Sequence, residues 1–178
     1  AVYMKNAYDA GHGRNTPGKR TPDDEREWSF NDAVARAFAA ELAKYEGVEL
    51  LRTDDPTGNT DVALSARTRK ANAWEADLYV SIHHNANTSK WGSWGGVETY
   101  IYTGSQPKSS RLAKEVHPRM VAAMGLRDRG IRSANLHIVR ETKCPAILTE
   151  GGFMDSTADI GALRDAAKLK PQAVAIAK

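Results

Sequence analysis

Short apolar runs alternate along this chain with segments of helical periodicity. That alternation is typical of an α/β fold, in which strands covered by helices on both faces read as continuous apolar stretches. We expect strands at residues 2–8, 48–52, 78–82, 97–103, 136–140 and 146–150.

Helices are expected between these strands. Phe30, Val34, Phe38 and Leu42 recur at spacings of four, which places them on one face of a helix over residues 27–45. Further helices are expected at 61–74, at 109–124 with Pro118 as a kink or break, and from 155 onward. Segments 14–24 and 87–96 read as loops.

Length and composition bound the possibilities further. A chain of 178 residues suits one domain, and its only cysteine, Cys144, excludes an internal disulfide and a Cys-rich zinc module. No apolar run approaches the ~18 residues of a membrane span, so we expect no membrane partner. The net charge of +3 comes without a long basic block, so we expect no nucleic-acid partner. We expect a monomer.

Polar side chains follow three of the predicted strands. His12 follows the first strand, His83-His84-Asn85 follows the central one, and Glu150 ends the last. Because ligands of open α/β sheets bind where the carboxyl ends of strands converge, these residues predict one shared site. Glu27 opens the helix after the first loop, which brings it near His12.

A His/His/Glu set is a known arrangement for catalytic zinc. His12, Glu27 and one of His83 and His84 fit it, because consecutive strand residues face opposite sides and the pattern does not say which of the two faces the site. A carboxylate outside the metal shell, here Glu150, can move the proton of water. Glu27 has an ordinary alternative as an acidic residue favoured at a helix start.

Four ordered motifs carry a resemblance to a known family. They are Asp9-Ala10-Gly11-His12-Gly13, Glu27-x-x-x-Asn31, Ser81-Ile82-His83-His84-Asn85-Ala86 and Glu150-x-Gly152-Phe153. Together they resemble the zinc-dependent N-acetylmuramoyl-L-alanine amidases of the third amidase family, found in bacterial autolysins and phage endolysins.

The resemblance implies a fold, a cofactor and residue roles. It implies a single α/β domain over residues 1–178, with a mixed, mostly parallel twisted sheet flanked by helices on both faces. One Zn²⁺ is implied on His12, Glu27 and His83, with Glu150 as the catalytic base and acid. The implied reaction is hydrolysis of the amide between N-acetylmuramic acid and L-alanine in bacterial peptidoglycan, which lyses the wall.

Four further residues are candidates for substrate binding. Asn85 could orient His83 or contact substrate, with a turn-forming role as the equal alternative. Arg140 could meet a muropeptide carboxylate, although a surface salt bridge is its ordinary role. Trp91 and Trp94 could stack on sugars or stem peptides, against the simpler role of covering the core.

Two other functions stay open, a zinc carboxypeptidase acting on wall peptides and a non-catalytic binder of the cell wall or of nucleic acid. The chain starts without the layout of a secretory signal, which favours a phage lysin held in the host cytoplasm until its release. It ends without a terminating signal, so we expect a further wall-binding module to follow in a natural protein.

Overall fold

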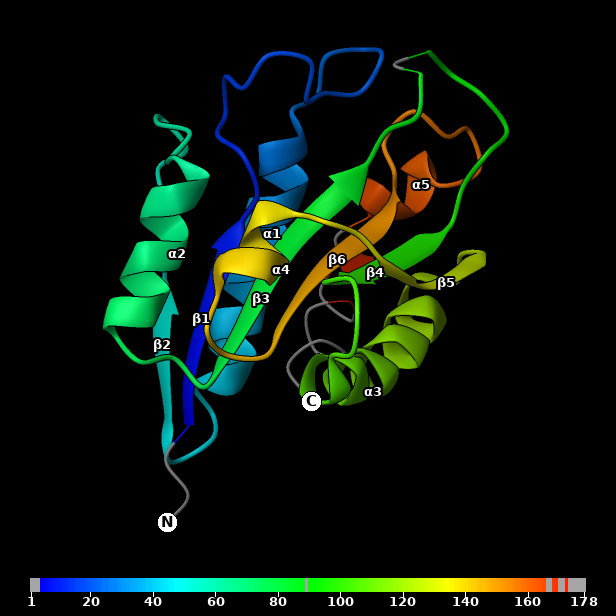
Figure 1. Ribbon diagram of the computed structural model, residues 1–178. Helices are drawn as coiled ribbons and strands as arrows, with labels where there is room; N and C mark the ends of the chain where they lie inside the picture. Colours follow the sequence, from blue (N-terminus) through cyan, green and yellow to red (C-terminus); the bar gives the residue numbers. More distant parts are fainter. Residues whose placement is uncertain (1–3, 89, 166–167, 170–171, 173–178) are drawn as a thin grey trace.

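The computed structural model describes residues 4–88, 90–165, 168–169 and 172, and its described strands form one sheet (Figure 1). The strands are β1 (Met4–Ala10), β2 (Val48–Arg52), β3 (Leu78–Asn85), β4 (Val97–Ile101), β5 (Asp128–Ser133) and β6 (Ala146–Phe153). Their order is β2-β1-β3-β6-β4-β5, and every neighbouring pair is parallel except the antiparallel pair β4 and β6. The expected mixed, mostly parallel sheet is confirmed.

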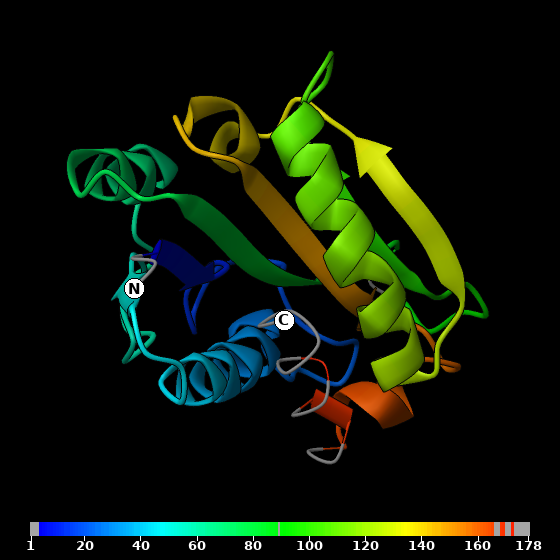
Figure 2. The same cartoon turned by 90° about the horizontal axis from the view of Figure 1, so that it is seen from below.

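Helices cover both faces of the sheet, as expected. They are α1 (Glu27–Leu42), α2 (Leu64–Ala73), α3 (Pro107–Met124), α4 (His137–Glu141) and α5 (Ile160–Leu163). The larger apolar cluster joins α1, α3 and α5 to one face, and the smaller cluster joins α2 and α4 to the other. Figures 1 and 2 show α1 and the pair α2/α4 on opposite sides of the sheet.

The prediction of a strand at residues 136–140 is wrong, because this segment forms the helix α4. Ile138 and Val139 have strand propensity, but both are buried in the cluster under α2 and α4. The amide of Arg140 donates to the carbonyl of Leu136 at 3.0 Å, which closes a helical turn. Packing against α2 therefore outweighs local propensity.

The edge strand β5 has no counterpart among the expected strands. Its sequence carries two arginines, an aspartate and a glycine, and most of its residues are exposed. Only pairing with β4 defines it as a strand.

Pro118 lies inside α3 without dividing it. The helical composition expected from 155 onward appears as α5, while the start expected at Val2 and residues 166–167, 170–171 and 173–178 lie outside the described part.

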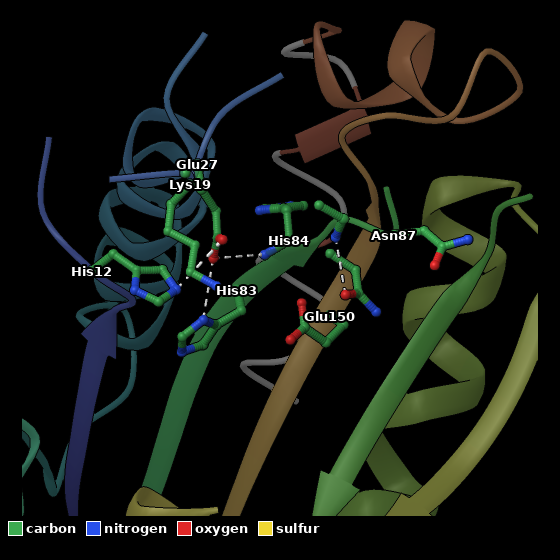
Figure 3. Close-up of a pocket in the computed structure, with 10 residues that line it drawn as sticks. His12, Lys19, Glu27, His83, His84, Asn87 and Glu150 are labelled. Carbon is green, nitrogen blue, oxygen red and sulfur yellow. Dashed lines mark hydrogen bonds and ion pairs between the residues drawn. The ribbon is translucent and has the colours of Figure 1, made fainter. Parts of the chain in front are cut away.

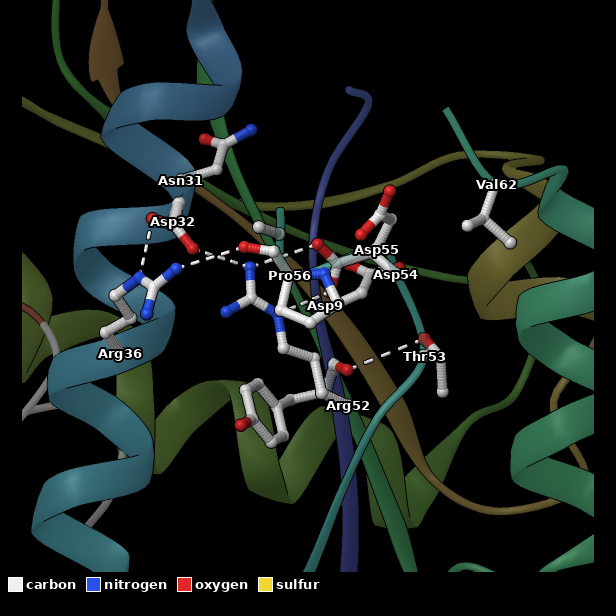
Figure 4. Close-up of polar contacts among 12 residues, drawn as sticks. Asp9, Asn31, Asp32, Arg36, Arg52, Thr53, Asp54, Asp55, Pro56 and Val62 are labelled. Carbon is white, nitrogen blue, oxygen red and sulfur yellow. Dashed lines mark hydrogen bonds and ion pairs between the residues drawn. The ribbon is translucent and has the colours of Figure 1, made fainter. Parts of the chain in front are cut away.

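A cluster of charged side chains fixes α1 against β2 (Figure 4). The guanidinium of Arg52 donates to Asp32 at 2.7 Å and to Asp54 at 2.7 and 3.0 Å. Its side chain is only 12% exposed, and these carboxylates keep the pKa of Arg52 above its usual value despite burial. Arg36 adds a bond to Asp32 at 2.8 Å. The start of α1 is thereby held beside the sheet edge that carries the polar motifs.

The carboxyl ends of β1, β3 and β6 meet at one edge of the sheet, since these three strands are adjacent and parallel. His12 lies just beyond β1, while His83 and Glu150 lie in the carboxyl-terminal halves of β3 and β6. In the part of the chain that the structure describes, none of the helices has the length and apolarity to cross a bilayer.

Candidate metal centre

The loop after β1 holds His12 by its backbone. His12 adopts a positive φ of 66°, which non-glycine residues rarely adopt. Its carbonyl accepts from the buried Arg67 of α2 at 3.0 Å, and the same guanidinium donates to the carbonyl of Ala10 at 3.0 Å and to Asp9 at 3.2 Å. A single buried cation thus fixes the end of β1 and the turn that presents the imidazole.

Glu27 lies between two imidazoles. Its Oε1 is 3.5 Å from Nε2 of His12, and its Oε2 is 3.2 Å from Nδ1 of His83 (Figure 3). One nitrogen or oxygen atom from each residue lies within 4.8 Å of the others, a grouping that could hold a metal ion. Two imidazole nitrogens and a carboxylate oxygen are the donor set that suits zinc with one position left open. The chain supplies this group without using its cysteine.

The ring of His83 depends on two small neighbours. Ser81 Oγ lies 3.0 Å from Nε2 of His83 and donates to Asp9 at 2.6 Å. This link leaves Nδ1 directed at Glu27, and outer partners of this kind orient metal-binding imidazoles. A Cβ on Gly11 would lie 2.1 to 2.5 Å from atoms of the His83 ring, so only glycine leaves room for the imidazole there.

The sheet faces decide between the two adjacent histidines. His83 lies on the site face, whereas His84 is buried on the opposite face against Phe30, with its ring centroid 5.9 Å away. Burial lowers the pKa of His84 to about 4, so its imidazole is neutral. Sequence periodicity left this choice open, and the resemblance pointed to His83.

Behind Glu27 runs a buried chain of hydrogen bonds. Asn31 donates from Nδ2 to Glu27 Oε2 and to the carbonyl of Gly11, both at 3.0 Å. Its Oδ1 lies 2.8 Å from Nδ1 of His84, so that nitrogen carries the proton and donates. His84 Nε2 then lies 3.4 Å from the amide nitrogen of Gln172. From the sequence, His84 was only the alternative ligand to His83, and Gln172 had no predicted role.

The charges within the cluster support one another. Burial raises the pKa of Glu27, but the hydrogen bond from His83 and the charge of both imidazoles outweigh it and hold the pKa at about 2. Burial lowers the pKa of His83, and Glu27 overcomes this and raises it to about 8. Glu27 is therefore a carboxylate in the neutral pH range, as a metal ligand must be.

Glu150 faces the same pocket from β6, where it is the register partner of His83. Burial raises its pKa to about 8. Its Oε2 is buried and has no hydrogen-bond partner among the described residues. A buried carboxyl oxygen without a partner is costly, and such groups occur where chemistry uses them.

One pocket of about 250 Å³, which Figure 3 shows in close-up, is lined by His12, Glu27, His83 and Glu150. Asn85, Asn87, Gly18 and Lys19 also line it. Lys19 comes from the loop between β1 and α1, and nothing in the sequence marks it apart from other lysines. Asn85 has its side chain engaged, since its Nδ2 donates to Glu98 at 2.6 Å and its Oδ1 accepts from its neighbour Ala86.

Three of the predicted substrate-binding residues lie outside the lining of this pocket. Trp94 donates from Nε1 to Asp155 at 2.8 Å and packs on Gly92, which gives it a structural role in its loop. Trp91 is 40% exposed and lies near the guanidinium of Arg164. Arg140 bonds to Glu141 and Asn135, and it lines a different depression beside the residues that precede β6.

The fold and site define a class, an α/β protein with a His/Glu/His group suited to a metal ion and a buried carboxylate opposite it. Comparison with known proteins agrees, because the family model described as N-acetylmuramoyl-L-alanine amidase matches residues 7–178. The chain belongs to this amidase family. The family resemblance drawn from the four motifs is thus confirmed.

Relatives and solved structures support this assignment. The chain is 36% identical over 157 residues to the sporulation-specific N-acetylmuramoyl-L-alanine amidase of Bacillus subtilis, covering 88% of this chain and 58% of that protein. It is 37% identical over 162 residues to the amidase CwlM of Bacillus licheniformis, covering 89% and 60%. The chain therefore spans less than two thirds of either relative.

A solved amidase has the same fold. The crystal structure of N-acetylmuramoyl-L-alanine amidase from Clostridium difficile 630 matches with a TM-score of 0.91 and 29% sequence identity, covering 99% of this chain and 94% of that one.

Proposed function

We propose that residues 1–178 form a catalytic domain that hydrolyses the amide between N-acetylmuramic acid and L-alanine in bacterial peptidoglycan. The observation that carries this proposal is the convergence of His12, Glu27 and His83 in one pocket with the carboxyl of Glu150, in a chain of the amidase family. Oε2 of that carboxyl has no hydrogen-bond partner among the described residues. The place of action follows from the substrate, at the bacterial cell wall.

We further propose that the domain holds one zinc ion on His12, Glu27 and His83. Their donor atoms fit such an ion in type and spacing, and Gly11 has no side chain where the His83 ring lies. When bound, zinc supplies Lewis acidity toward the scissile carbonyl and toward water. Arg67, Ser81 and Asn31 hold the three ligands in place through the contacts described above.

Glu150 moves the protons in this proposal. Its carboxyl lines the pocket from β6, next to His83 on β3. As a base, it takes a proton from the attacking water; as an acid, it gives that proton to the nitrogen of L-alanine as the amide breaks. Its Oε2, which accepts no hydrogen bond from the described residues, is available for both steps.

A metal analysis paired with a turbidity assay on purified bacterial walls tests this function. We expect about one zinc per chain, clearing of the walls by the wild type, and no clearing after a chelator until zinc is restored. Glu150→Gln serves as the matched variant, because it keeps the three ligands and replaces only the acid. A wild type that binds zinc yet leaves walls intact would contradict the proposal.

A further inference from the structure

The face of the sheet that carries Glu150 continues into a second polar cluster. Glu98 on β4 is the antiparallel register partner of Glu150, whose other neighbour is His83 on β3. Paired residues project from the same face, and so do residues two apart on a strand. Tyr100 therefore shares the face of Glu98, and its register partner Arg132 on β5 shares it too. A row of polar side chains thus runs from His83 to Arg132.

Glu98 organises this cluster. Its side chain is only 4% exposed, and its carboxylate accepts from Asn85 at 2.6 Å and from the hydroxyl of Tyr100 at 3.3 Å. Nε of Arg132 forms an ion pair with it at 2.7 Å. Nε of Arg129 lies 3.7 Å from the same carboxylate. Because Asn85 also lines the pocket, Glu98 joins Arg132 to the wall of the proposed active site.

Arg132 is anchored at one end and open at the other. Its Nε lies against Glu98 and the carbonyl of Arg129, whereas its two terminal nitrogens have no hydrogen-bond partner among the described residues. The side chain is 49% exposed. A guanidinium held in this way presents two parallel N–H groups, the geometry that binds a carboxylate through two hydrogen bonds.

Positive charge exceeds negative charge around Glu98. Two guanidinium groups, those of Arg129 and Arg132, face the single carboxylate of Glu98. Asp128, at the start of β5, bonds instead to His117 of α3 at 2.7 Å, on the other face of the sheet. The cluster therefore favours an anion.

We propose that Arg132, assisted by Arg129, is a subsite for a free carboxylate of the stem peptide. This inference rests on the proposed function, since that function places the scissile amide at Glu150. Two strand spacings, about 10 Å, separate β6 from β5, and an extended peptide advances about 3.4 Å per residue. The carboxylate bound there belongs to the second or third residue of the stem.

The charge distribution indicates that the stem peptide, and not the glycan, runs from Glu150 toward Arg132. The sugars of the glycan are uncharged, so the cationic end of the row suits the peptide half of the substrate. The structure thus assigns to Arg132 the role that sequence alone suggested for Arg140, whose side chain lies outside the pocket lining.

Three synthetic N-acetylmuramoyl tripeptides test the subsite, with a free carboxylate at the second residue, at the third residue, or at neither because both are amides. We expect the wild type to favour one of the acids over the diamide by about 10- to 100-fold in kcat/KM, through KM. Arg132→Lys keeps a charge beside Glu98 but lacks the two parallel N–H groups of a guanidinium. We expect it to lose this preference without losing activity on the diamide. Arg132→Gln is the second variant.

Arg119→Ala is the control, because Arg119 is a half-exposed arginine on α3 whose one ion pair among the described residues is with Glu115. It should retain the full preference of the wild type. A wild type that hydrolyses all three substrates equally would overturn the subsite, and so would an Arg132→Lys variant that loses activity equally on all three. If the wild type frees no stem peptide from any substrate, the proposed function fails, and calorimetric titration of the same compounds still decides the subsite. Tighter binding of an acid than of the diamide supports it, and equal binding contradicts it.

Discussion

Replacing Asn31 with leucine removes the hydrogen bonds that hold Glu27 while roughly keeping the side-chain volume. Asn31 is fully buried and makes three bonds, two as a donor to Glu27 Oε2 and the carbonyl of Gly11 and one as an acceptor from His84. Glu27 keeps its contacts with His83, whereas the Gly11 carbonyl and His84 Nδ1 keep no partner among the described residues.

The magnitude follows from those two groups. Each buried group left without a partner costs about 1–3 kcal/mol, so Asn31→Leu should lower the free energy of unfolding of the metal-free protein by about 2–6 kcal/mol. Loss of an outer partner of a metal ligand typically weakens metal binding by about 10- to 100-fold. We expect a loss of zinc affinity in that range.

Urea denaturation of the metal-free protein and competition with a chromophoric zinc chelator measure the two effects. Arg36→Ala is the control on the same helix, because its 63% exposed side chain contacts Asp32 and the carbonyl of Pro56 but none of the proposed metal ligands. The control should leave zinc affinity unchanged. An Asn31→Leu variant with wild-type stability and wild-type zinc affinity would show that Asn31 does not hold Glu27 in place.

Three further substitutions separate the roles of the site residues. Glu150→Gln should still bind one zinc by mass spectrometry but hydrolyse walls at least about 100-fold more slowly; near-normal lysis would exclude it as the proton carrier. His12→Ala should lose zinc on dialysis, and a stoichiometric zinc content would remove it from the ligand set. Gly11→Ala places a methyl group within 2.5 Å of the His83 ring and should weaken zinc binding at least about 10-fold, whereas Gly161→Ala, with open space around it, should not; equal zinc affinity in both would show that the ring has room to move.

The expected fold followed from features that are local in the sequence. Buried strands such as β3 and β6 are continuous apolar runs, and α1 has an apolar face, so these elements were predicted within a few residues. The edge strand β5 has no such pattern, since its partner on one side alone defines it. The segment of α4 is an apolar run too short for periodicity to distinguish a helix from a strand.

The candidate site was predictable where chemistry and strand ends coincide. His12, His83 and Glu150 all follow the rule that parallel strands converge at their carboxyl ends, and the structure brings them into one pocket with Glu27. Lys19 reaches that pocket from an irregular loop, and such a loop has no period from which its path could be inferred.

The cluster around Glu98 depends on register. Only the pairing of Glu98 with Glu150 across an antiparallel step reveals that β4 and β5 extend the site face. For the same reason Arg132 carried no signal in the sequence, whereas Arg140 drew attention as a charge on an expected strand that is a helix.

Product analysis on purified peptidoglycan distinguishes amide hydrolysis from cleavage of the other bonds of the wall. Digestion by the zinc-loaded domain, followed by mass spectrometry and end-group assays, should release intact stem peptides with new L-alanine amino termini. It should create no new reducing sugar ends and no free single amino acids, and a chelator or Glu150→Gln should abolish the release. Release of single amino acids would instead indicate a carboxypeptidase, and the absence of any product from zinc-loaded protein would contradict the assignment of hydrolysis to this site.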